Sequence, residues 1–171
     1  MQEAHQPAIT ITRITDTEDQ NWCAALMANS EPWISLKRNY EDGQALMRVT
    51  DGGMEAYLAK IGKERLGFVV IKMAGAFVGY IQILAVAEAS RGMGIGNQLM
   101  NYVEDRIFQV SPNAFICVSD FNENARKLYE ARGYQLLGKL ENYLENGFTE
   151  LLLRKTIGSI NDFRAKKLSN A

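Results

Sequence analysis

The sequence predicts an α/β (α+β) domain built on a mixed, mostly antiparallel sheet of six to seven strands flanked by helices. Short β-branched or apolar runs alternate along the chain with segments of helical periodicity. Short turns at 62–65 and 74–75 join three consecutive strand-like runs, which is typical of an antiparallel meander. With 171 residues the chain has the size of one domain.

The N-terminal half is predicted to contain two helices and four strands. Residues 8–13 alternate β-branched and other side chains, which favours a strand. Asp16 can cap a helix over 17–28, because its carboxylate can accept backbone N–H bonds; the apolar face of this helix would carry Trp22, Ala25 and Leu26. A second helical stretch covers 40–48. The three strands of the meander are expected at 55–61, 67–73 and 76–86.

The C-terminal half continues the alternation. A helix follows the glycines near residue 96, since apolar residues recur at helical spacing over 99–108. Residues 114–118 predict a buried strand, and 122–132 a helix closed by Gly133, a residue suited to a C-terminal cap. Two more strands are expected at 134–140 and 148–154. Ser159 can cap a short final helix bearing Ile160, Phe163 and Leu168, and a frayed tail is the alternative.

These elements give one domain over residues 8–155. It is expected to stand between a flexible N-terminus at 1–7 and a C-terminal extension at 156–171. The extension would be a short helix or a tail, which docks on the domain or mediates self-association.

Composition narrows the function classes. The 19 Lys and Arg nearly balance the 20 Asp and Glu, for a net charge of -1. A nucleic-acid or anionic-membrane partner usually shows as a basic excess, so neither is expected. The two cysteines fit a reducing compartment. No secretory signal is visible, and the longest apolar stretch, 74–86, is too short to span a bilayer. A cytoplasmic location is therefore expected.

A glycine-rich turn precedes the helix at 99–108. It reads SRGMGIG over residues 90–96, that is, R-x-x-G-x-G. Backbone N–H groups at such a turn can surround a phosphate. The dinucleotide fingerprint G-x-G-x-x-G fails because Asn97 stands at the third glycine position, and a P-loop fails because no Gly-Lys-Ser/Thr follows. A loop without a ligand and a nucleotide-binding module are the alternatives.

A second motif follows the turn. From Asn122 the chain reads NENARKLYEARGY, or N-x-x-A-x-x-L-Y-x-x-x-G-Y. Together with LAVAEASRGMGIG at 84–96, it resembles the GNAT superfamily of acyl-CoA-dependent N-acyltransferases. The resemblance covers roughly 8–155 and is most specific over 81–134. It implies a splayed pair of central strands, and the layout is most similar to the ribosomal-protein alanine N-acetyltransferase branch.

The resemblance implies acetyl-CoA as cosubstrate and no metal. The turn would bind the pyrophosphate through Gly92, Met93, Gly94, Ile95, Gly96 and Asn97, and Arg91 would add charge. The pantetheine arm would run along the backbone of Leu84, Ala85 and Val86, which could also stabilise the oxyanion. Asn122 would bond this arm or cap its helix.

Tyr129 is the candidate general acid. The family places a tyrosine at this motif position, and a phenol with a pKa of about 10 is protonated at neutral pH and can supply a proton to the departing thiolate. The alternative is a core aromatic. The general base is not evident. The alanine N-acetyltransferase branch has a glutamate at the position of Cys117, and other branches have a carboxylate at the position of Tyr80 or Gln82. Cys117 is either a nucleophile or a buried strand residue.

The acceptor site is expected opposite the cofactor, with candidate residues Glu31, Trp33, Tyr80 and Tyr143. Aromatic side chains with one acidic group suit a small amine or a peptide N-terminus; Trp33 could equally cover the core. The resulting hypothesis is direct acetyl transfer through a ternary complex, to a primary amine, by a monomer or homodimer. A non-catalytic acyl-CoA sensor is the alternative.

Overall fold

A computed structural model describes residues 8–48 and 53–169 of the chain. The predicted flexible N-terminus at 1–7 therefore lies outside the described residues. The strands are β1 (Thr10–Arg13), β2 (Met54–Ile61), β3 (Glu64–Lys72), β4 (Tyr80–Val86), β5 (Asn113–Ser119), β6 (Gln135–Glu141) and β7 (Thr149–Thr156). The helices are α1 (Thr17–Ala28), α2 (Tyr40–Arg48), α3 (Ile95–Phe108), α4 (Glu123–Ala131) and α5 (Ile160–Ser169), with a 3₁₀ turn η1 (Glu88–Ser90).

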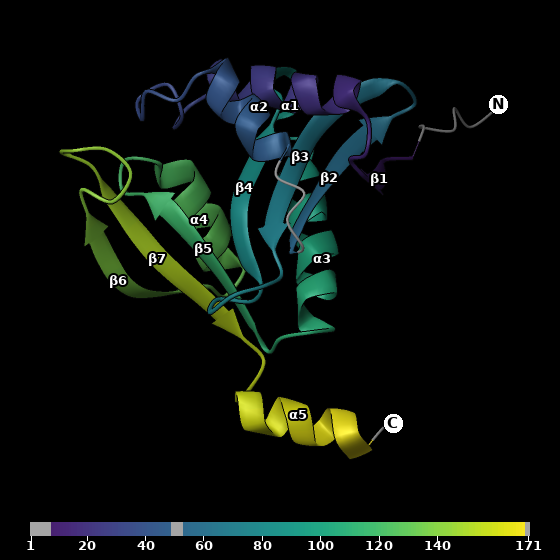
Figure 1. The fold of residues 1–171 in the computed structure, drawn as a ribbon, viewed down its shortest axis with the longest axis vertical. Coiled ribbons are helices and arrows are strands. Elements are labelled where there is room, and N and C mark those ends of the chain that lie inside the picture. Colours follow the sequence, from purple (N-terminus) through teal and green to yellow (C-terminus); the bar gives the residue numbers. More distant parts are fainter. Residues whose placement is uncertain (1–7, 49–52, 170–171) are drawn as a thin grey trace.

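The strands form one seven-stranded sheet in the order β1-β2-β3-β4-β5-β7-β6 (Figure 1). Every neighbouring pair is antiparallel except β4 and β5, which run parallel. The predicted mixed, mostly antiparallel sheet is confirmed, and so is its expected size.

The parallel pair separates almost as soon as it forms. β4 and β5 are paired only at Tyr80↔Phe115 and Ile81↔Ile116. The next residue of β4, Gln82, is an extra residue in the register with β3, where Ile71 pairs with Ile81 and Val70 with Ile83. A bulge of this kind bends its strand and increases the local twist. The two halves of the sheet consequently diverge beyond the bulge (Figure 1), which is the predicted splay.

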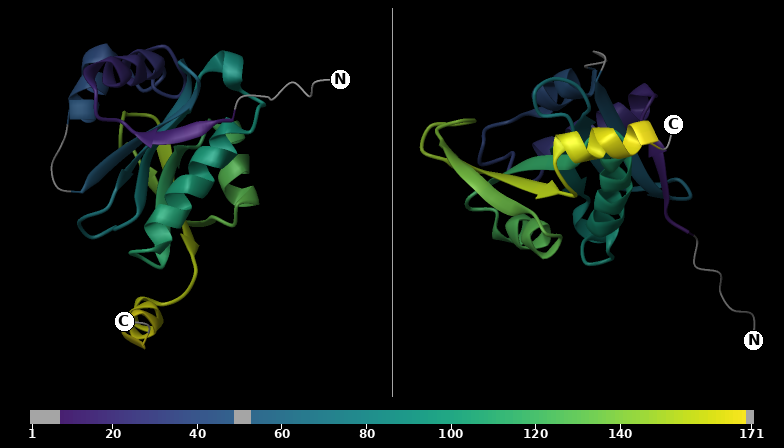
Figure 2. Two further views of the ribbon diagram at one scale, coloured as in Figure 1. Left: turned by 90° about the vertical axis from the view of Figure 1, so that its right-hand side faces the viewer. Right: turned by 90° about the horizontal axis from the view of Figure 1, so that it is seen from below.

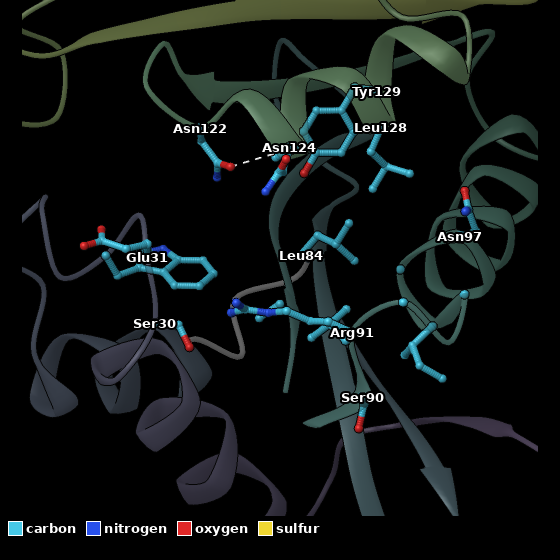
Figure 3. Close-up of a pocket in the computed structure, with 18 residues that line it drawn as sticks. Ser30, Glu31, Leu84, Ser90, Arg91, Asn97, Asn122, Asn124, Leu128 and Tyr129 are labelled. Carbon is cyan, nitrogen blue, oxygen red and sulfur yellow. Dashed lines mark hydrogen bonds between the residues drawn. The ribbon is translucent and has the colours of Figure 1, made fainter. Parts of the chain in front are cut away.

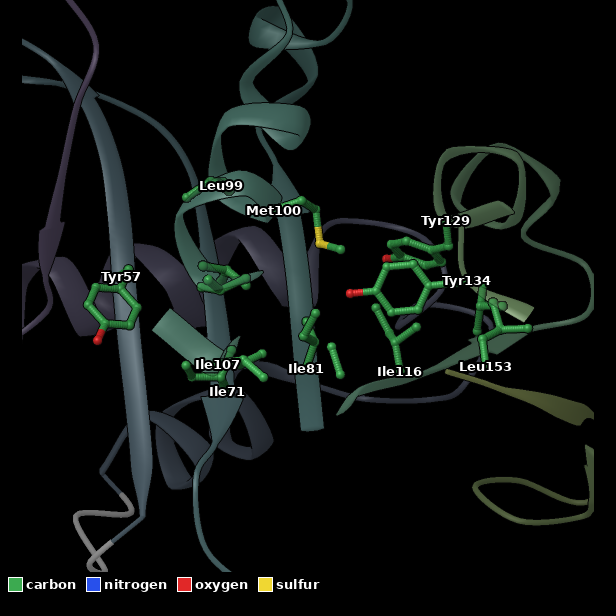
Figure 4. Packing of buried hydrophobic residues seen from close by; sticks show 14 of the residues in the cluster. Tyr57, Ile71, Ile81, Leu99, Met100, Ile107, Ile116, Tyr129, Tyr134 and Leu153 are labelled. Atoms are coloured by element: carbon green, nitrogen blue, oxygen red, sulfur yellow. The ribbon is translucent and has the colours of Figure 1, made fainter. Parts of the chain in front are cut away.

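Helices cover both faces of the sheet, with α1 and α2 on one side and α3 and α4 on the other (Figure 2). Beneath α3 and α4 lies the larger apolar cluster, which joins both halves of the sheet through residues such as Ile71, Ile81, Ile116 and Leu153 (Figure 4). A smaller cluster under α1 and α2 contains Cys23, Met27 and Phe68. Since the sheet is buried on both faces, its central strands read as nearly continuous apolar runs.

The predicted strand at 76–86 is too long. β4 begins at Tyr80, because Gly79 has a φ of 88° and leaves the extended conformation. A Cβ at Gly79 would lie 2.5 Å from Ile107 Cγ2 and 2.6 Å from the Asn113 carbonyl oxygen. Only glycine fits at this point, so the chain turns beneath α3 at Gly79. A longer loop replaces the expected turn at 74–75.

The buried face of α1 also differs from the prediction. Cys23, Ala24 and Met27 are buried, whereas Trp22 and Leu26 are only partly covered. The polar residue Asp19 shares the buried face, where Lys60 Nζ and Arg65 Nε each donate a hydrogen bond of 2.6 Å to it. Burial opposes ionisation of Asp19, but these bonds outweigh it and hold its pKa below the ordinary value.

The predicted helix caps are present. Asp16 accepts the Asp19 N–H at 2.8 Å, Gly133 has a φ of 90°, and Ser159 Oγ accepts the Asp162 N–H at 3.1 Å. α5 follows β7 and extends away from the sheet (Figure 1), with none of its side chains buried. None of the helices in the described part of the chain has the length and apolar character needed to cross a membrane.

Replacing Gly79 tests the close approach beneath α3. Gly79→Ala should lower the free energy of unfolding by about 3 kcal/mol, because positive φ and the collision with Ile107 add together. The control is Gly75→Ala: Gly75 has a φ of 92°, but no atom lies within 4 Å of its Cβ position, so the loss should be about 1 kcal/mol. Chemical denaturation measures both, and equal losses would contradict the steric argument.

Candidate active site

A pocket of about 600 Å³ lies where the two halves of the sheet diverge, a size typical of ligand sites (Figure 3). Its walls come from the end of β4, the glycine turn, the start of α3, α4 and the loop after α1. The predicted cofactor-binding residues lie on these walls with the exception of Met93, which is 53% exposed and is not among the wall residues. The wall residues among them are Leu84, Ala85, Val86, Arg91, Gly92, Gly94, Ile95, Gly96, Asn97 and Asn122.

The glycine turn lies on the wall of this pocket and leads directly into α3. Gly92 and Gly94 have φ values of 77° and 78°, a conformation in which glycine is favoured. The first i→i−4 bond of α3 runs from the Gln98 N–H to the Gly94 carbonyl at 3.1 Å, and no side chain caps Gly94. The amides of residues 95–97 thus precede the helical bonding pattern, and such amides attract anions.

The side chains of Asn97 and Arg91, at the two ends of the glycine turn, point to different partners. Asn97 Oδ1 accepts a bond of 3.0 Å from Arg132 Nη1, which links the first turn of α3 to the end of α4. The Arg91 side chain points across the pocket toward the loop that carries Glu31 (Figure 3). Arg91 thus lines the pocket, where its guanidinium can contact an anionic ligand.

The end of β4 has one unpaired edge. Its other edge is bonded to β3, with Val69↔Leu84, Phe68↔Ala85 and Gly67↔Val86 in register. Pairing with β5 ends at Ile81, so the β4 edge that faces the pocket is not bonded by a strand. The side chains of Leu84 and Val86 pack against the larger core cluster. A ligand beside this edge would therefore contact backbone N–H and C=O groups, as at any open sheet edge.

Tyr129 lies at the inner end of the pocket. It is 5% exposed, its ring lies 6.0 Å from that of Tyr134, and its hydroxyl points into the pocket (Figure 3). Burial raises the pKa of Tyr129, so the hydroxyl is protonated at neutral pH. The tyrosine is thus both a core aromatic and a wall of the pocket.

Asn122 is a helix cap, as one of the two predicted alternatives requires. Its Oδ1 accepts the Ala125 N–H at 3.3 Å at the start of α4. The residue also lines the pocket, and the cap engages only the oxygen of its side chain. The two predicted roles are therefore compatible.

A smaller cavity of about 130 Å³ adjoins the first and shares Glu31, Trp33, Leu84, Asn122, Ala125 and Tyr129 with it. Tyr80, Gln82, Cys117, Ser119 and Glu150 line its other walls. Three of the four predicted acceptor residues, Glu31, Trp33 and Tyr80, are thus brought together. The fourth, Tyr143, is 60% exposed and lies outside both walls.

Cys117 does not have the features of a nucleophile. Burial raises the pKa of its thiol, and a hydrogen bond with Tyr80 only partly offsets this effect. Reactive cysteines have a lowered pKa, because the thiolate is the attacking species. At neutral pH the Cys117 side chain is a neutral thiol in the cavity wall.

The sequence prediction missed Glu150. This residue of β7 is 3% exposed, lines the smaller cavity and accepts a hydrogen bond from Ser119 Oγ. Burial raises its pKa, an effect that the Ser119 bond opposes and the neighbouring Asp120 reinforces. A signal was available: Glu150 is the one charged residue within the apolar run FTELLL at 148–153.

Comparisons with known proteins agree with this architecture. Residues 15–134 match the model of the acetyltransferase (GNAT) family. An uncharacterised N-acetyltransferase of Methanocaldococcus jannaschii is 32% identical over 101 residues, which span 58% of this chain and 64% of that protein. The matched region is thus slightly less than two thirds of that relative.

Two solved structures illustrate the shared fold. A Desulfovibrio desulfuricans protein of the GNAT family has a TM-score of 0.74 at 16% identity, over 88% of this chain and all of that chain. Spermidine N-acetyltransferase from Vibrio cholerae, in complex with CoA and spermine, has a TM-score of 0.68 at 16% identity, over 86% of this chain and 95% of that chain. With the family match covering most of the chain and both motifs on the pocket wall, the chain belongs to the acetyltransferase (GNAT) family.

Proposed function

We propose that this family member transfers the acetyl group of acetyl-CoA directly to a primary amine, on a small molecule or a peptide N-terminus, within a ternary complex. One observation carries the proposal. The free amides of the glycine turn, the unpaired edge of β4 and the Tyr129 hydroxyl converge on one pocket, which continues into a smaller acidic cavity.

The glycine turn suits the pyrophosphate of acetyl-CoA. Several amides converge there at the positive end of the α3 dipole, which stabilises negative charge. A Cβ at Gly96 would lie 3.7 Å from Val86 Cγ2 and 3.8 Å from Leu128 Cδ2, both on the pocket wall. A side chain at this position would therefore grow into the space assigned to the phosphates.

The edge of β4 suits the pantetheine arm, which contains two amide groups. An extended amide chain can bond an open strand edge as an added strand would. This placement brings the thioester to the point where the two cavities meet, next to Tyr129. A backbone N–H of β4 is then positioned to stabilise the developing oxyanion.

Tyr129 is proposed as the general acid. Its hydroxyl is protonated, points into the pocket and lies where the thioester sulfur would be placed. Proton donation to the departing sulfur avoids release of a free thiolate. The amine would attack from the smaller cavity, whose charged wall residues are Glu31 and Glu150. An amine acceptor agrees with the spermine bound by the Vibrio cholerae relative.

Gly96→Glu tests the pyrophosphate site. Acetyl-CoA should raise the melting temperature of the wild type, because a ligand that binds only the folded state stabilises it. The variant should lose this shift and keep its own melting temperature, since an acidic residue is favourable in a first helical turn. The control Gly138→Glu adds the same charge on β6, where no atom lies within 4 Å of the Cβ position. A normal shift in Gly96→Glu would place the pyrophosphate elsewhere.

Tyr129→Phe tests acid catalysis. The variant removes only the hydroxyl, so kcat should fall about 100-fold while the acetyl-CoA thermal shift is retained. Tyr134→Phe is the matched control, because Tyr134 packs beside Tyr129 but lies outside both cavity walls. Release of free thiol measures turnover. Unchanged kcat in Tyr129→Phe would remove the residue from the chemistry. A wild type that binds acetyl-CoA but releases no thiol with any amine would instead favour an acyl-CoA sensor.

Cys117→Ala tests direct transfer against a covalent acetyl-enzyme. The side chain is small and its thiol is neutral, so the folded variant should retain most of its turnover. Mass spectrometry of the wild type with acetyl-CoA alone should show no acetylated Cys117. A folded but inactive Cys117→Ala together with an acetylated wild-type protein would establish the covalent route instead.

A further inference from the structure

Four carboxylates are buried in the described residues: Asp19, Glu55, Glu104 and Glu150. A buried carboxylate is strongly destabilising unless a cation and hydrogen bonds compensate it. Three of the four have such a cation. Asp19 pairs with Lys60 and Arg65, Glu55 with Arg106, and Glu104 with Arg132 and Lys155, at distances of 2.6 to 3.0 Å.

Glu150 is the exception. None of the ion pairs among residues 8–48 and 53–169 involves it, and its hydrogen-bond partner is the neutral Ser119 hydroxyl. The charged side chain that raises its pKa, Asp120, has the same sign. Within the described part of the chain, the other buried carboxylates thus have cationic partners and Glu150 has none.

The position of Glu150 indicates where the missing cation comes from. Its carboxylate lines the smaller cavity, together with Tyr129 from the cofactor pocket. Among the described residues that form that wall there is no Lys, Arg or His, and the other charged one is Glu31. A cavity of about 130 Å³ accommodates a small cationic group with an alkyl neighbour rather than a bulky ring system.

We infer that Glu150 binds the ammonium group of the acceptor amine and takes one of its protons before acetyl transfer. The inference rests on the proposed function and names the acceptor class more narrowly, as an amine that arrives protonated. The ammonium group of the acceptor then supplies the positive charge that the described residues do not place beside Glu150.

The transfer balances as follows. One N–H proton of the ammonium moves to the Glu150 carboxylate, and the freed nitrogen lone pair attacks the thioester carbonyl carbon. The C–S bond then breaks, its electron pair goes to sulfur, and Tyr129 donates the proton that forms the thiol. The nitrogen loses its second proton, which restores Tyr129 through solvent, and Glu150 releases its proton to solvent.

The surrounding groups define the pH dependence. Tyr80 on β4 and Cys117 on β5 both have raised pKa values and are neutral at pH 7, so they add no charge. Burial, and secondarily Asp120, raises the pKa of Glu150 above that of an ordinary glutamate. Glu150 must be ionised to take a proton. Activity should therefore fall as the pH drops through this raised value, above the range of an exposed glutamate.

Glu150→Gln tests the inference. We would screen the wild type with acetyl-CoA against alkyl monoamines, diamines, amino-acid amides and short peptides, and then compare kcat/KM on the best acceptor. Glu150→Gln should lose at least about 100-fold at pH 7, as expected for a positioned base, while the acetyl-CoA thermal shift is unchanged. Glu141→Gln, an exposed residue of the same β6–β7 hairpin, is the control and should match the wild type.

Two further measurements separate catalysis from structure. Ser119→Ala removes the bond that favours the carboxylate, so the acidic limb of kcat/KM should move to higher pH. Glu150→Gln should melt at or above the wild-type temperature, because it removes an uncompensated charge, whereas Glu104→Gln should melt below it. If Glu150→Gln melts at a lower temperature than the wild type, or if the acidic limb of the kcat/KM profile does not move in Ser119→Ala, Glu150 has a structural role and the inference is wrong.

The outcomes distinguish the two proposals. If the wild type acetylates amines and Glu150→Gln keeps its kcat/KM, this inference is wrong and the proposed function stands. If the wild type binds acetyl-CoA but acetylates no amine, the proposed acceptor class is wrong and the inference is overturned with it.

Discussion

The separation of β4 from β5 is the constraint on which the site depends. Two residue pairs hold the parallel strands together, and the bulge at Gln82 then turns β4 away. Without this divergence the sheet would be continuous and β5 would cover the edge of β4. The divergence leaves an open backbone edge on β4 and space for two cavities that share wall residues.

A divided sheet needs other contacts to hold its halves, and the larger core cluster and one ionic network provide them. Glu104 on α3 binds Arg132 after α4 and Lys155 on β7, and Arg132 also contacts Asn97 and Asn101. The network thus ties the helix behind the glycine turn to the helix that carries Tyr129. The glycine turn and Tyr129 are thereby fixed relative to one another.

The two cavities have opposite electrostatic character. Free amides at the start of α3, with Arg91 over the mouth, suit the anionic end of acetyl-CoA. The charged residues described on the wall of the smaller cavity are Glu31 and Glu150, which suits a cationic amine. Under the proposed function each substrate would meet the complementary charge, and Tyr129 lies on the wall that both cavities share.

The sequence by itself determined the element types, the caps at Asp16 and Gly133, the glycine turn and the position of Tyr129, because periodicity, capping and motif spacing are local properties. Only the tertiary structure decided three other features. β4 starts at Tyr80 because Gly79 passes under Ile107, and α1 buries Asp19 because Lys60 and Arg65 come from other strands to meet it. Glu150 lines the smaller cavity together with Tyr129 because β7 pairs with β5, which brings in a carboxylate that is distant from Tyr129 in sequence.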